Sequence, residues 1–359
     1  MLDTESKTFL LDYLDTPSPT GFEWRGQKKW VDYTRRYADT VENDAYGTAW
    51  ATLKGSAKNP KTVMLEAHAD EIGFMVKMIS KDGFLYLDRV GGSDVATARG
   101  RRIEILGDKG MVRGVIGNTA IHIRDRDDEK APKVHELYVD IGASNEKEVA
   151  AAGIRVGHAA VYAASVEFFG KDLVMGRALD NRVGGFIISQ VLRRLAAKKT
   201  RPASNVQFVN AVQEEIGGHG ARMIAYRLYP DVAVCLDVTH ATDTPGIDKA
   251  KHGDVKLGNG PSITHGTCNH PKVVERLMDA AKKAGVKIQH ESSSRYSGTD
   301  TDEIFNVRQG VPSGLISLPL RYMHSVIEIA SLKDVEKVIQ VLVAFVENVK
   351  PTDDFAIKL

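Results

Sequence analysis

Strand-like and helix-like segments alternate through the C-terminal half of this chain. Apolar runs predict strands at 206–212, 232–236, 286–289 and 314–318, and amphipathic stretches predict helices at 220–229, 271–284 and 332–349. Parallel strands are joined by crossover connections, usually helices, so the alternation predicts a mostly parallel sheet covered on both faces. Predicted helices at 4–14 and 23–37 and a buried strand at 62–65 fit the same sheet. We therefore expect an α/β fold.

Residues 71–165 have a different pattern. Short apolar runs at 73–79, 84–90 and 103–106 are separated by glycine turns such as Lys81-Asp82-Gly83, which is typical of β-hairpins. A chain of 359 residues is long for a single core. We predict a discontinuous α/β domain, formed by residues 1–70 and 166–359, with a small β domain inserted at 71–165.

Charge and composition exclude several classes of function. The net charge is +1, so there is no overall basic surplus of the kind that binds nucleic acid or anionic membranes. No apolar stretch reaches the roughly 18 residues needed to span a bilayer, and the acidic first residues do not resemble an export signal. Two cysteines, Cys235 and Cys268, suggest no disulfide framework. We expect a cytoplasmic protein without nucleic-acid or membrane partners.

Five potential metal ligands occupy similar positions along the chain. Four follow an apolar, strand-like run, and the fifth opens a predicted helix. Open α/β sheets bind ligands outside the carboxyl ends of their strands, so side chains placed there can converge from distant parts of the sequence. The five residues are His68, Asp180, Glu215, Asp237 and His324.

Each of these residues alone has an ordinary structural explanation. Asp180 stands where a helix N-cap is expected, Asp237 fits a turn, and His324 fits a hydrogen-bonded loop. The pair His68 and Asp70 is also compatible with a surface loop. Their shared position in the predicted topology favours a common site instead.

Adjacent glutamates suggest a division of labour at this site. Successive side chains on an extended segment point in opposite directions, so Glu215 can bind a metal while Glu214 acts as a base beside it. Asp70 is close enough in sequence to accept the second ring N–H of His68. Without cations, carboxylates gathered there would repel one another. The set therefore predicts metal-assisted hydrolysis.

Six strings, in order along nearly the whole chain, resemble those of a known enzyme family. They are residues 66–73 (EAHADEIG), 176–182 (GRALDNR), 213–217 (QEEIG), 236–238 (LDV), 298–300 (GTD) and 321–325 (RYMHS). This set is similar to that of the tetrahedral (TET) and deblocking aminopeptidases, the family that includes glutamyl aminopeptidase. Its fold is of the zinc-exopeptidase type with an inserted small β domain.

The resemblance implies a dinuclear site. Asp180 would bridge two divalent ions, His68 and Asp237 would complete one, and Glu215 and His324 the other. Glu214 would be the general base that takes a proton from a water bridging the ions, and Asp70 would orient His68. The resemblance also implies a cis peptide bond after Asp180.

Zinc or cobalt is expected as the metal, because two histidines join the carboxylates and imidazole suits the later first-row metals. The predicted function is a metallo-aminopeptidase that removes N-terminal residues from short peptides. The resemblance further implies dimers, formed through the inserted domain, that assemble into a tetrahedral homododecamer.

Two other functions stay open on the sequence alone. One is a deacylase or amidase that acts on a specific small metabolite with the same site, and the other is a non-enzymatic scaffold of the same fold. Substrate preference is also open, since the segments 265–270 and 300–303 differ from typical family members. Asp302 or Glu303 would favour basic N-terminal residues, unless these acids simply occupy an exposed helix start.

Overall fold

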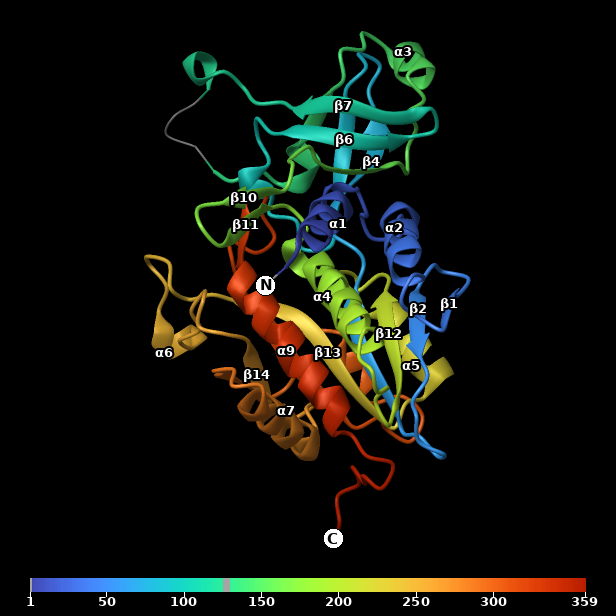
Figure 1. Cartoon of the computed structure of the whole chain (residues 1–359). Helices are drawn as coiled ribbons and strands as arrows, with labels where there is room; N and C mark the ends of the chain where they lie inside the picture. The colour runs from blue at the N-terminus through green and yellow to red at the C-terminus, as the bar shows by residue number, and fades with distance from the viewer. Residues whose placement is uncertain (1, 125–129) are drawn as a thin grey trace.

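The computed structural model describes residues 2–124 and 130–359 and consists of a large α/β domain and a smaller β-barrel (Figure 1). The barrel is inserted into the α/β domain, as the sequence predicts. Within the described residues, no helix is both long enough and apolar enough to cross a bilayer.

The α/β domain is built on an eleven-stranded mixed sheet. Its strands run in the order β1 (Thr40–Asn43), β2 (Ala49–Leu53), β12 (Asn205–Ala211), β3 (Thr62–His68), β13 (Val232–His240), β16 (Ser313–Arg321), β17 (Glu328–Ser331), β11 (Leu173–Gly176) and β10 (Glu167–Phe169), with β14 (Ser262–Gly266) and β15 (Gln289–Ser293) attached through β16. The central strands β12, β3, β13 and β16 are parallel, as expected. Antiparallel pairs extend the sheet at both margins.

Helices cover the two faces of this sheet unequally. The larger layer contains α1 (Thr4–Asp15), α2 (Trp24–Thr34), α4 (Leu179–Ala196), α7 (Pro271–Lys283) and α9 (Leu332–Asn348), which supply most of the helical residues of the main apolar cluster. The other face is covered by α5 (His219–Leu228) and α8 (Thr301–Ile304), through a smaller cluster. A short helix, α6 (Lys249–His252), lies on a peripheral connection (Figure 1).

Side-chain alternation assigns the potential ligands to the thinly covered face. In β3, Val63 and Leu65 pack into the main cluster, whereas Met64 packs into the smaller one. Because strand side chains alternate between faces, His68 lies on the same face as Met64. The same parity holds in β13, where Cys235 belongs to the smaller cluster and Asp237 follows two residues later. The less covered face therefore carries both side chains.

The inserted domain closes into a six-stranded barrel with its own apolar core. Its strands are β4 (Gly73–Ile79), β5 (Leu85–Val90), β8 (Tyr138–Asp140), β7 (Gly110–Ile116), β6 (Arg102–Gly107) and β9 (Ala159–Tyr162), in barrel order, with helix α3 (Glu146–Ala151) and the short 3-10 turns Val95–Thr97, Ile121–Ile123 and Val134–Glu136. The predicted domain boundaries and the predicted dimerisation role of this domain stay predictions.

Some element boundaries differ from the sequence expectation. The strand expected at 286–289 begins only at Gln289, because the N–H of Val286 donates to the carbonyl of Ala281 and so belongs to the end of α7. The apolar pattern predicts no separate strands at the positions of β1, β2, β10, β11, β14 and β17.

Candidate metal centre

Neighbouring parallel strands bring His68 and Asp237 together. The last paired residues of β3 and β13 are Glu66 and Cys235, and each potential ligand lies two positions further along its own strand. Both are buried, with side-chain atoms His68 Nε2 and Asp237 Oδ1 separated by 3.8 Å. The register of the central sheet thus determines the positions of His68 and Asp237.

Asp180 lies at the start of α4 but does not cap it, which corrects the capping alternative. Asp180 and Asn181 have non-helical backbone angles, and the peptide bond between them is cis, as the resemblance implied. The Asn181 Oδ1 accepts the N–H of Gly184 at 3.1 Å, and its Nδ2 donates to the carbonyl of Leu236 at 2.6 Å. Asn181 therefore satisfies the helix start, which leaves the Asp180 carboxylate available to the site.

The Asp180 carboxylate stands between the two histidines. Its Oδ1 lies 3.3 Å from His68 Nε2, and its Oδ2 lies 3.2 Å from His324 Nε2. Glu215 Oε2 is 3.5 Å from His324 Nε2. Potential ligand atoms of His68, Asp180 and Asp237 lie within 4.8 Å of one another, as do those of Asp180, Glu215 and His324. All five residues predicted as ligands are therefore brought together in two groups that share Asp180.

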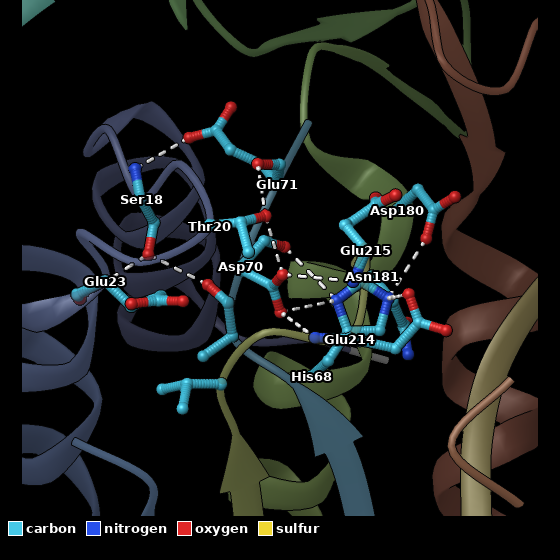
Figure 2. A network of polar contacts seen from close by, with 12 residues as sticks. Ser18, Thr20, Glu23, His68, Asp70, Glu71, Asp180, Asn181, Glu214 and Glu215 are labelled. Atoms are coloured by element: carbon cyan, nitrogen blue, oxygen red, sulfur yellow. Dashed lines mark hydrogen bonds and ion pairs between the residues drawn. The ribbon is translucent and has the colours of Figure 1, made fainter. Parts of the chain in front are cut away.

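Asp70 is fully buried and lies on the side of His68 opposite to Asp180 (Figure 2). Its Oδ1 accepts the backbone N–H of Glu214 at 3.0 Å and lies 3.4 Å from His68 Nδ1. Its Oδ2 accepts the N–H of Glu215 at 3.2 Å and the hydroxyl of Thr20 at 2.8 Å. Although burial opposes it, contact with His68 and these hydrogen bonds lowers the pKa of the Asp70 carboxyl. Asp70 thus contacts the backbone of both glutamates and, through its carboxylate and its backbone carbonyl at 3.2 Å, His68 Nδ1.

Glu328 contacts two of the predicted ligand segments, which the sequence pattern did not predict. It is buried on β17, where its Oε1 accepts the N–H of His324 at 2.8 Å and its Oε2 accepts the N–H of Asp180 at 3.1 Å. Burial and the nearby Asp180 raise the pKa of the Glu328 carboxyl well above its usual value. The sequence feature that could have pointed to Glu328 is its position as the one charged residue within the apolar run 326–330. Glu328 links the two ligand segments much as Asp70 links the glutamates.

The inserted domain also reaches this site, through the glycine pair that follows β5. A side chain on Gly92 would place its Cβ 2.5 Å from His324 Nδ1, and one on Gly91 would come within 3.1 Å of the Glu215 Cβ. The carbonyl of Gly92 lies 3.2 Å from His324 Nδ1. The Nδ1 of His324 therefore faces the carbonyl of Gly92, while its Nε2 faces the carboxylates of Asp180 and Glu215.

Carboxylates at the site are held close together in a buried setting. Burial raises the pKa of Glu214 to about 8, against the opposing effect of His68. Burial, followed by repulsion from Asp180, raises the pKa of Glu215 well above its usual value, and burial does the same for Asp237. The Glu215 Oε1 is buried and has no hydrogen-bond partner among the described residues. Such a set is costly alone and is suited to cations.

A cavity of about 750 Å³ opens from the site to the surface. Its lining includes Glu214, Asp302 and Glu303. Both oxygens of Asp302 accept backbone N–H groups of 297–298, at 3.0 and 2.8 Å, and Glu303 Oε2 lies 3.6 Å from a guanidinium nitrogen of Arg222. The two acids considered for substrate preference therefore already have partners.

Comparisons with known proteins agree on one family. A family model described as M42 glutamyl aminopeptidase matches residues 47–341. The chain is 34% identical over 343 residues to the lysyl aminopeptidase of Pyrococcus furiosus, which covers 95% of this chain and 96% of that protein.

Solved structures give the same result. The TET aminopeptidase of a marine sediment archaeon of the Thaumarchaeota has a TM-score of 0.91 at 30% identity, covering 96% of this chain and 97% of that one. The TET1 peptidase of Pyrococcus horikoshii, described as assembling into a tetrahedron or a large octahedral shell, has a TM-score of 0.84 at 27% identity, covering 96% and 100%. The chain therefore belongs to the M42 glutamyl aminopeptidase family, and aminopeptidase activity is the function that this membership supports.

Proposed function

We propose that this chain is a dinuclear metallo-aminopeptidase in which Asp180 would be a ligand shared by two divalent ions. The observation that carries this proposal is the placement of the Asp180 carboxylate, with one oxygen 3.3 Å from His68 Nε2 and the other 3.2 Å from His324 Nε2. Each histidine has a second acid beside it, Asp237 for His68 and Glu215 for His324. Two ligand groups that share one carboxylate match the needs of a metal pair.

The residues fit divalent cations on chemical grounds. The unpartnered Glu215 Oε1 and the raised pKa values of Glu215 and Asp237 indicate negative charge that lacks compensation within the described chain. Mixed imidazole and carboxylate donors favour zinc or cobalt over magnesium. When bound, the two ions would act as Lewis acids that polarise the scissile carbonyl and acidify water.

Glu214 is proposed as the general base. It lines the cavity, and its Oε2 lies 3.8 Å from His68 Nε2. With His68 and Glu215 it forms a further group of potential ligand atoms, and the family resemblance is what assigns it the role of base. A general base must lie within reach of the proton that it takes, and the Glu214 carboxylate borders both the cavity and the potential ligands. Glu214 would take a proton from the attacking water and pass it to the leaving amine. Asp70 would hold Glu214 in place through its backbone N–H.

The proposed substrates are short peptides with a free N-terminus, and the proposed location is the cytoplasm. The proposed assembly is a homo-oligomer, with dimers formed through the inserted barrel and arranged as a tetrahedral dodecamer. The similarity to the Pyrococcus horikoshii peptidase supports this assembly. Light scattering coupled to size-exclusion chromatography tests it, because a monomeric protein at micromolar concentration would rule out the dodecamer.

The function itself is tested with aminoacyl anilides, assayed before and after chelation and metal restoration. Hydrolysis of substrates with a free α-amino group, lost on chelation and restored by zinc or cobalt, is the expected result. A matched panel of N-acylated substrates separates the other candidates. Preference for acylated compounds would replace the aminopeptidase by a deacylase, and inactivity on both panels with metal bound would favour a scaffold.

A further inference from the structure

A second cavity, of about 360 Å³, adjoins the one that contains the candidate metal centre. The two cavities share lining residues, including Thr239, Ser297 and Thr299, so they are neighbouring compartments of one hollow. The lining of the smaller compartment consists largely of serine and threonine, and Glu291 is its acidic residue. A compartment of this kind suits a polar side chain better than an apolar one.

Sheet register connects this compartment to the metal centre. Asp237 on β13 pairs with Ser317 on β16, and Ser317 pairs with Ser262 on β14. Two residues along β14, Thr264 pairs with Glu291 on β15. Paired residues share a face, as do residues two apart on one strand. Glu291 therefore points to the same face of the sheet as the potential ligand Asp237, across a floor of small hydroxyl side chains.

A hydrogen bond ties Glu291 to the strand that carries Asp237. Its Oε1 accepts the hydroxyl of Thr239 at 2.6 Å. Thr239 lies two residues beyond Asp237 on β13, and two strand residues span about 6.6 Å. This spacing of Asp237 and Thr239 along β13 is comparable with the length of an extended lysine side chain. A residue bound with its α-amino group near the metal centre would thus carry its side-chain terminus toward Glu291.

The second carboxylate oxygen of Glu291 has no hydrogen-bond donor among the described residues. Its Oε2 is buried and lacks a hydrogen-bond partner within residues 2–124 and 130–359, and Glu291 forms no ion pair there. Arg295 also lines the compartment, but it is exposed to solvent and lies outside ion-pair distance of Glu291. A buried carboxylate oxygen without a donor carries an uncompensated desolvation cost that an incoming cation would offset.

From this geometry we infer that Glu291 is the specificity-determining residue for the first residue of the substrate, and that it selects a basic side chain such as lysine or arginine. The inference rests on the proposed aminopeptidase function and deepens it. It moves the acidic determinant from Asp302 and Glu303 to Glu291. Both oxygens of Asp302 accept backbone N–H groups, and Glu303 lies beside the guanidinium of Arg222, whereas Glu291 has a buried oxygen without a donor that an ammonium or guanidinium group could contact.

The test compares lysyl and norleucyl anilides, because norleucine has nearly the shape of lysine without its charge. With the full-length, metal-loaded protein, kcat/KM for the lysyl substrate should exceed that for the norleucyl substrate on the order of 10- to 100-fold, the range for a charge-assisted contact. Glu291→Gln should bring this ratio close to one, mainly by raising KM for the lysyl substrate, while norleucyl hydrolysis continues. Continued norleucyl hydrolysis also shows that the variant folds.

Matched variants complete the design. Glu275→Gln removes an exposed carboxylate on α7 and should keep the wild-type ratio. A ratio unchanged in Glu291→Gln would overturn the inference, and so would a ratio lost in Glu303→Gln but kept in Glu291→Gln. A wild type that cleaves both anilides equally would overturn the inference alone. A metal-loaded wild type that cleaves neither anilide would overturn the proposed function as well.

Discussion

The buried carboxylate of Asp70 accepts the backbone N–H of Glu214 at 3.0 Å while it lies 3.4 Å from His68 Nδ1. One side chain thus fixes both a predicted ligand and the predicted base. The contact with His68 was expected from the two-residue spacing, but the contact with Glu214 joins segments that are 144 residues apart. Asp70 is therefore a positioning residue for the whole proposed reaction centre.

Replacing Asp70 by Asn should weaken metal binding and turnover together. An amide cannot accept both the Glu214 and Glu215 N–H groups as the carboxylate does, and it removes the negative charge beside His68. A loss of about 10- to 100-fold in metal affinity or activity is expected for a partner of a metal ligand. Competition with a chromogenic chelator measures the affinity. Asp32→Asn, on an exposed helical pair with Lys28, is the control. Wild-type affinity and activity in Asp70→Asn would remove its positioning role.

Replacing Glu214 by Gln should leave the metals bound and nearly abolish hydrolysis. The amide keeps the shape of the side chain but cannot take up a proton, and general-base catalysis typically contributes on the order of 10²- to 10⁴-fold. Steady-state kinetics with a leucyl anilide and elemental analysis of the same sample separate the two effects. Glu42→Gln, an exposed change on β1, serves as the comparison. Substantial remaining turnover in Glu214→Gln would assign the base to another group.

The glycine at position 92 should be required for the geometry of His324. A Cβ there would lie 2.5 Å from His324 Nδ1, so Gly92→Ala must displace the ring or the loop that follows β5. The variant should resemble a milder His324→Ala, with weaker binding of one of the two ions and a lower kcat. Isothermal titration calorimetry with the metal compares the two variants. Unchanged binding of both ions in Gly92→Ala, beside a clear loss in His324→Ala, would show that the inserted domain does not constrain this ligand.

Glu23 should make the stability of the protein depend on pH. It is buried, and burial, followed by repulsion from Asp70, raises its pKa from 4.5 to about 7. Between these values the native state binds a proton that the unfolded state releases. The stabilisation from this group is therefore fully present below about pH 4.5 and is lost as the pH rises through 7.

Substituting Glu23 by Gln should remove this dependence, because the amide stays neutral and can still accept the N–H of Gly21, at present 2.7 Å from Glu23 Oε1. The free energy of unfolding of the variant minus that of wild type should therefore be larger at pH 8 than at pH 5, by about 1–3 kcal/mol. Urea denaturation of metal-loaded samples at both pH values measures the difference. The same difference between variant and wild type at the two pH values would contradict the assignment.

Much of the site could be predicted because it depends on local pattern and sheet topology. The positions of His68 and Asp237 follow from where two apolar strands end, and the need for cations at the adjacent glutamates follows from their predicted buried surroundings, where paired carboxylates repel each other. The capping alternative for Asp180 was wrong because the side chain of the next residue, Asn181, accepts the N–H of Gly184 at the helix start. Hydrophobic periodicity does not show which of two adjacent polar side chains caps a helix.

Contacts between distant segments were beyond the sequence pattern. Glu328 was missed because its function lies in accepting two backbone N–H groups, which only the folded arrangement brings to it. Gly92 was missed because its closeness to His324 depends on how the barrel packs against the α/β domain. Glu291 became visible only through the register of β14, β15 and β16.

The most direct test of the account is the number of zinc or cobalt ions bound per chain, measured by elemental analysis after equilibrium dialysis of wild type and of Asp180→Ala. Two ions per wild-type chain and the loss of both from the variant are expected, because Asp180 is the proposed shared ligand. A wild-type chain that saturates at a single ion, or a variant that still binds two, would contradict a centre bridged by Asp180.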